Sequence, residues 1–109
     1  TFTSLWTTSK FHDQNPKTYR TFMAALEEAM QLINADKTAI AKLWIGAEKS
    51  KLSQAFVEKI LRDPENTFTT TPQNMMKYAE FMHKVGAIKE KPARWSDMFF
   101  PEIHGKPGS

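Results

Sequence analysis

The chain has 109 residues, of which 40% are hydrophobic and 12% aromatic, and it carries a formal net charge of +3. This balance predicts a packed domain rather than a disordered segment. The sequence contains no cysteine, which excludes a disulfide scaffold, a thiolate metal site and a cysteine nucleophile. No apolar run approaches the roughly 18 residues of a membrane-spanning helix. Basic residues alternate with acidic ones instead of forming the block that is typical of nucleic-acid binders.

Residues 1–11, TFTSLWTTSKF, combine large apolar side chains with serine and threonine. That mixture favours an extended strand over a helix. A lone strand is unstable in water, so it requires a sheet that this chain does not supply. We therefore expect the chain to be a piece of a longer protein. Residues 12–15 are predicted to form a polar turn.

Residues 15–36 are predicted to form one long amphipathic helix. Asn15 is expected to cap the first backbone N–H groups, and Pro16 suits the first helical position. The apolar side chains recur at alternating spacings of three and four, as one helical face requires. They are Tyr19, Phe22, Met23, Leu26, Met30 and Ile33. Each gains roughly 1.5–3 kcal/mol on burial, so other segments must cover this face.

Three further helices are predicted over residues 37–49, 53–62 and 72–86. Asp36 and Ser53 are the expected N-caps of the first two. One apolar face is expected on each helix. The face of the helix over residues 37–49 is Ile40, Leu43, Trp44 and Ala47, and that of the helix over residues 53–62 is Phe56, Val57, Ile60 and Leu61. The apolar positions of the helix over residues 72–86 are Met75, Met76, Ala79, Met82 and Val85, with Tyr78 and Phe81 alongside.

Thr71-Pro72 is predicted to open the helix over residues 72–86, and Gly86 to end it in a left-handed cap. Phe68 is expected to anchor the preceding loop, residues 96–100 to form a short turn, and residues 102–109 to be irregular. The fold class is therefore mainly α, with about four helices after an N-terminal extended segment.

The sequence offers few residues with the spacing of a reactive site. His12, His83 and His104 lack the paired spacing of a zinc site, so metal binding would need two of them to meet near Asp13 or Asp97. The neighbouring carboxylates at positions 27 and 28 point about 100° apart on a helix and cannot share a proton. No glycine-rich phosphate loop and no nucleophile elbow is present. We expect no enzyme activity, no metal and no cofactor.

Basic residues at positions 84, 89, 91 and 94 precede Trp95. Cations beside an aromatic ring are able to combine phosphate contacts with base stacking. Glu90 interrupts the run, and Trp95 serves equally well as a packing anchor. Both interpretations stay open on the sequence.

Several motifs, in their order along the chain, resemble the C-terminal third of periplasmic substrate-binding proteins of ABC importers, of the nitrate, taurine, alkanesulfonate and thiamine-precursor type. The resemblance begins at LWTTSKFHDQNPKTYRTFMAALEEAMQLINAD and continues through LSQAFVEKIL, the Phe68 to Thr71-Pro72 entry, FMHKVGAIKEKP and RWSDMFF. It covers almost the whole chain.

The resemblance implies a two-lobed α/β periplasmic-binding-protein fold of type II, to which this region adds a strand and a set of helices. In that family the solute lies in a cleft between the lobes, which close on it before docking on a membrane permease. Trp6, Thr7 and Thr8 are the residues of this chain that it places near the cleft. The alternative to a solute contact at Trp6 is that its side chain is a buried packing residue.

We therefore expect the C-terminal part of a periplasmic solute receptor, or of an extracellular one anchored to the membrane. Its solute would be a small anionic or organic compound whose identity this sequence does not specify, and its partner an ABC permease; nucleic acid is not expected. In isolation the chain is expected to self-associate. The alternative is a free-standing small helical adaptor that binds a protein partner or nucleic acid.

Overall fold

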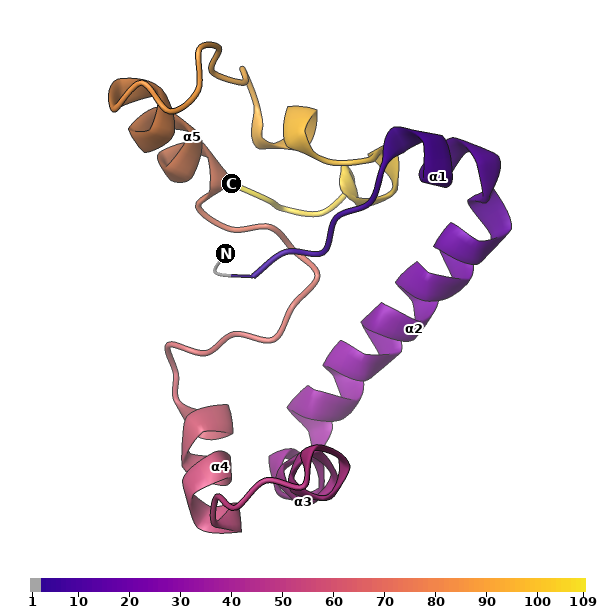
Figure 1. The fold of residues 1–109 in the computed structure, drawn as a ribbon, viewed down its shortest axis with the longest axis vertical. Helices are drawn as coiled ribbons and strands as arrows, with labels where there is room; N and C mark the ends of the chain where they lie inside the picture. The colour runs from indigo at the N-terminus through magenta and orange to yellow at the C-terminus, as the bar shows by residue number, and fades with distance from the viewer. Residues whose placement is uncertain (1–2) are drawn as a thin grey trace. The chain divides into compact units, whose positions relative to one another are not determined.

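The computed structural model describes residues 3–109, and Figure 1 shows the course of the chain. The described residues are mainly helical, which confirms the predicted mainly α class. They form five α-helices, where about four were predicted, and they contain no strand. They form two compact units. The central unit comprises Lys10–Thr69, and the terminal unit comprises residues 3–9 together with residues 70–109. From the sequence we expect a single piece.

The start of the chain differs from the predicted strand. Residues 3–8 belong to no helix or strand, and residues 1–2 lie outside the described residues. Ser9–Gln14 forms α1, so the extended prediction is wrong for residues 9–11 and the turn prediction is wrong for residues 12–14. The stretch rich in serine and threonine ends at Ser9. The next five residues, Lys, Phe, His, Asp and Gln, are compatible with a helix. Residues 3–8 form no strand either, so the strand prediction fails over all of its described residues.

Helix α2 covers Pro16–Ala35 and has 20 residues. Asn15 lies between α1 and α2 with φ −129° and ψ 50°, outside the helical region, as expected for a residue before proline. Its side chain does not cap α2. The Asn15 Nδ2 group instead donates to the Phe11 carbonyl oxygen at 3.0 Å, so this cap prediction is wrong.

Two helices with side-chain caps follow α2. Helix α3 covers Lys37–Glu48, and the Asp36 carboxylate accepts a hydrogen bond from the Ala39 N–H at 2.9 Å. Helix α4 covers Gln54–Arg62, and the Ser53 hydroxyl accepts from the Phe56 N–H at 3.3 Å. Both predicted caps are confirmed.

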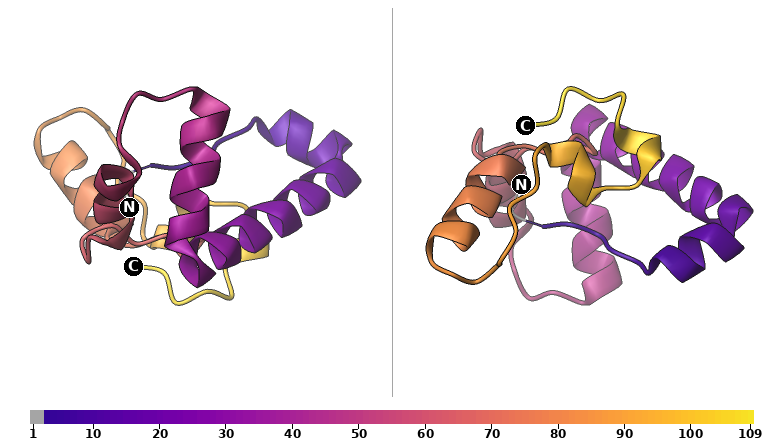
Figure 2. Two further views of the ribbon diagram at one scale, coloured as in Figure 1. Left: turned by 90° about the horizontal axis from the view of Figure 1, so that it is seen from below. Right: turned by 90° about the horizontal axis from the view of Figure 1, so that it is seen from above.

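Helix α4 packs against α3, and α3 also contacts α2 (Figures 1 and 2). Ala41 of α3 and Val57 of α4 are buried. A polar cluster joins the same two helices. Thr38 Oγ1 donates to Glu58 Oε2 at 3.0 Å and accepts from an Arg62 nitrogen at 3.0 Å. The packing of the two helices and these hydrogen bonds hold α4 on α3.

Phe68 is half-buried beside the junction of α2 and α3, in agreement with its predicted role as an anchor. The Lys37 ammonium lies 4.6 Å from the centre of the Phe68 ring. The Asn34 side chain donates to the Phe68 carbonyl oxygen at 2.9 Å. These contacts hold the end of the central unit on its own helices.

Helix α5, in the terminal unit, covers Met75–Lys84 and begins three residues later than predicted. Its N-cap Asn74 has a left-handed backbone with φ 57°, and Pro72 is buried. The Pro72 carbonyl oxygen accepts from the Ser109 N–H at 3.1 Å. A pairing with a residue so far along the chain explains why the local Thr71-Pro72 signal did not start the helix.

The end of α5 follows its local sequence. Gly86 has φ 77°, the Gly86 N–H donates to the His83 oxygen, and the Ala87 N–H donates to the Met82 oxygen. This is the Schellman pattern, and it confirms the predicted left-handed cap. Two 3₁₀ turns follow, η1 at Trp95–Met98 and η2 at Pro101–Ile103. Ile103 is buried, although residues 102–109 were predicted to be irregular.

Candidate functional site

The predicted solute contacts Trp6, Thr7 and Thr8 lie directly before α1. Trp6 is 88% exposed, Thr7 is half-buried and Thr8 is exposed. The described residues therefore do not bury Trp6, and its packing against another part of a larger protein stays the alternative. A large aromatic ring that faces solvent is free to contact a ligand. The role of the three residues in binding a solute stays a prediction.

The histidines lie in three different environments. The His12 Nδ1 atom lies 2.8 Å from an Asp13 carboxylate oxygen, and its ring meets Tyr19 edge-on. His83 is exposed on α5. The His104 Nε2 atom lies 2.9 Å from the Phe99 carbonyl oxygen. Among residues 3–109, no three histidine or acidic side chains gather as metal ligands would.

Trp95 is half-buried against other side chains of the terminal unit. Its ring centre lies 5.9 Å from that of Phe99 and 6.2 Å from that of His104. In the neighbouring basic segment, Arg94 pairs with Asp97 at 3.3 Å and Lys91 pairs with Glu80 at 3.8 Å. Packing of the indole and pairing of these cations favour the anchor interpretation over base stacking.

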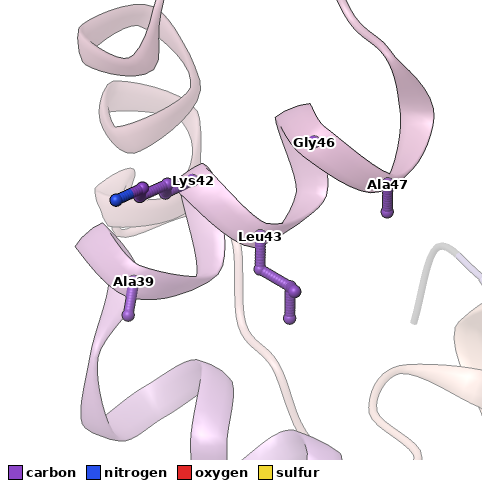
Figure 3. Close-up of a pocket in the computed structure, with 5 residues that line it drawn as sticks. All are labelled: Ala39, Lys42, Leu43, Gly46 and Ala47. Atoms are coloured by element: carbon purple, nitrogen blue, oxygen red, sulfur yellow. The ribbon is translucent and has the colours of Figure 1, made fainter.

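Helix α3 presents an exposed apolar face opposite its contact with α4. A shallow depression there is lined by Ala39, Lys42, Leu43, Gly46 and Ala47. Figure 3 shows the side chains of Ala39, Leu43 and Ala47 on one side of the helix, with Lys42 turned away from them. Leu43 is 67% exposed. The predicted face of Ile40, Leu43, Trp44 and Ala47 is therefore not the buried one: Ile40 is half-buried and the other three are exposed, whereas Ala41 is buried.

Helix α5 also has an exposed apolar face. Ala79 is buried and Met75 and Met76 are half-buried, whereas Met82 and Val85 are exposed, contrary to the predicted single face. Tyr78 and Phe81 are exposed on the same helix. The sequence places Tyr78 and Phe81 alongside the predicted face but does not determine which side is buried, because apolar residues cover most of the helix circumference.

No helix in the described part of the chain is long and apolar enough to cross a membrane. Comparisons with protein-family models, with curated proteins and with solved structures found no match to this chain.

Proposed function

We propose that this chain is the C-terminal part of a solute-binding protein of an ABC importer, of the nitrate, sulfonate, taurine or thiamine-precursor class. In this proposal the full protein captures a small anionic or organic solute in the periplasm and delivers it to a membrane permease. The order of motifs that resemble this family supports the assignment.

The observation that carries the proposal is the amount of apolar surface on the helices. In the described residues, four hydrophobic side chains are buried, whereas fifteen large ones are exposed. Monomeric soluble proteins rarely expose contiguous apolar faces of this kind. A sheet and a second lobe contributed by a larger protein would cover the faces of α3 and α5. This is the cover that the family's architecture provides.

Trp6, Thr7 and Thr8 are the proposed solute contacts. The exposed indole of Trp6 supports this role, because it offers a flat apolar surface for an organic solute. The two hydroxyls offer donors for an anionic group. The chain contributes binding groups and no catalytic residue in this proposal.

A free-standing helical adaptor is the second candidate, and the α3 face favours it. The small residues Ala39, Gly46 and Ala47 beside Leu43 would allow a partner helix to approach closely. In that case the exposed faces would be covered by a separate protein rather than by the remainder of the same one.

The mass and location of the natural polypeptide distinguish these candidates. Immunoblotting of fractionated source cells should show a periplasmic product of about 200–300 residues or more, as two domains require. A cytoplasmic product of this chain's own 12.5 kDa would overturn the receptor proposal. The adaptor candidate would then be tested by partner capture on an immobilised chain and on a Leu43→Lys variant.

The solute contact is tested in the full-length protein. Replacing Trp6 with alanine should weaken solute binding about tenfold, which corresponds to about 1.4 kcal/mol, in isothermal titration calorimetry. Trp44→Ala is the matched control, since Trp44 is an exposed tryptophan on α3 that is not assigned to the cleft. Equal affinities of the Trp6 variant and the parent would remove Trp6 from the binding site.

A further inference from the structure

The last residues of the chain lie against the start of α5. Ser109 is engaged through three groups: its N–H donates to the Pro72 oxygen, its hydroxyl accepts from the Asn74 N–H at 3.0 Å, and its backbone oxygen accepts from the Met75 N–H at 2.6 Å. The Asn74 side chain makes no capping hydrogen bond to α5. Ser109 therefore supplies the acceptors that a helix start requires and that a local cap residue usually provides.

A second contact lies one residue earlier. A Cβ atom placed on Gly108 would lie 2.6–2.8 Å from three ring carbons of Trp95. The backbone at Gly108 thus rests directly on the indole, at a distance that only glycine allows. The other neighbours of this ring are Phe99 and His104.

A third contact fixes the segment at its beginning. The Lys106 ammonium donates to Thr70 Oγ1 at 2.7 Å, and this pair is partly buried. Residues 106–109 therefore touch residues 70–75 at both ends and Trp95 in the middle. Figure 1 shows the C-terminal trace returning to the beginning of α5.

We propose that residues 106–109 form a strap, a segment that caps α5 and covers Trp95 as an intramolecular ligand of the terminal unit. Release of the strap leaves the first N–H groups of α5 without their acceptors and exposes the Trp95 ring. The last turn of α5 has its own Schellman cap and stays folded. The strap is thus a conformational device with a closed and an open state, and it is independent of the proposed transport function.

Two glycines three residues apart provide a matched test. Gly108→Ala places a methyl group in the Trp95 ring, whereas a Cβ at Gly105 meets nothing within 4 Å. Both variants are made in the full chain that also carries Trp6→Phe and Trp44→Phe, so that Trp95 is the only tryptophan and is excited selectively. Amide hydrogen exchange is measured at Met75 and at Ala87, and the Trp95 emission maximum is recorded.

In the Gly108→Ala variant we expect the Met75 amide to exchange about tenfold faster, as the loss of one hydrogen bond implies. The emission of Trp95 should move to longer wavelength, and the Ala87 amide should be unchanged. The Gly105→Ala variant should match its parent in all three measurements. If the Gly108→Ala and Gly105→Ala variants gave the same amide exchange and the same Trp95 emission, the strap proposal would be overturned.

A variant without added bulk separates strap release from unfolding of the unit. Ser109→Ala removes the hydroxyl acceptor of the Asn74 N–H and adds no atoms. Exchange should accelerate at Asn74 and remain unchanged at Ala87. Equal acceleration at both amides, in this variant or in Gly108→Ala, would mean that residues 106–109 have no open state of their own, and would refute the proposal.

Discussion

At the residue scale, Lys49 stands out because it has a left-handed backbone although it is not a glycine. Its φ is 49° and its ψ is 37° at the end of α3. The Ser50 N–H donates to the Ile45 oxygen and the Lys49 N–H to the Gly46 oxygen, which is again the Schellman pattern. A side chain in this region costs roughly 1–2 kcal/mol relative to the right-handed conformation. Lys49 therefore holds strain that the cap tolerates.

Lys49→Gly should relieve that strain and raise the free energy of unfolding by about 1 kcal/mol, measured by urea denaturation. Lys49→Ala keeps the Cβ atom and serves as the control, for which we expect no gain. If the two variants have the same midpoint and slope, the Cβ atom at position 49 does not destabilise the fold.

At the element scale, α3 carries alanines in two opposite environments. Ala41 is fully buried, and Ala47 lines the exposed face. Ala41→Leu should overfill the contact and lower the free energy of unfolding by about 1–3 kcal/mol. Ala47→Leu, with the same added volume on the same helix, should change it by less than about 0.5 kcal/mol. Similar losses in thermal or urea unfolding for both would contradict the packing of α4 on α3.

The elements that sequence predicted well are those with local signals. Asp36 and Ser53 cap their helices through side chains three residues away from the donors, and Gly86 needs no partner beyond the last turn of α5. The start of α5 depends instead on Ser109, 34 residues after Met75. No local pattern contains that pairing, so the predicted start at residue 72 was three residues early.

Buried faces were harder to predict than helices for a related reason. Helix α3 has apolar residues on several sides, and only the position of α4 makes Ala41 the buried one. The candidate solute contacts came from a family resemblance rather than from a pattern of chemistry. The structure adds the exposure of Trp6 to that prediction and leaves the binding role to experiment.

At the scale of the whole molecule, the exposed apolar faces predict association. In isolation the chain should form dimers or larger species at micromolar to millimolar concentration, because apolar faces gain free energy when water is excluded. Leu43→Lys should shift the sedimentation-velocity distribution toward monomer. Leu32→Lys adds the same charge at an exposed leucine of α2, outside the α3 face, and should leave the sedimentation-velocity distribution unchanged. A parent chain that is monomeric throughout this range would contradict the prediction.

The length of α2 limits which molecules are able to contact both of its ends at once. At 1.5 Å per residue, its 20 residues hold the two ends of the helix roughly 30 Å apart. The pair of His12 and Tyr19 lies at one end, and the junction with α3 lies at the other. A nitrate ion or a sulfonate is several times shorter than this span. A molecule of that size is too short to span α2, and only a macromolecule is long enough to reach both of its ends.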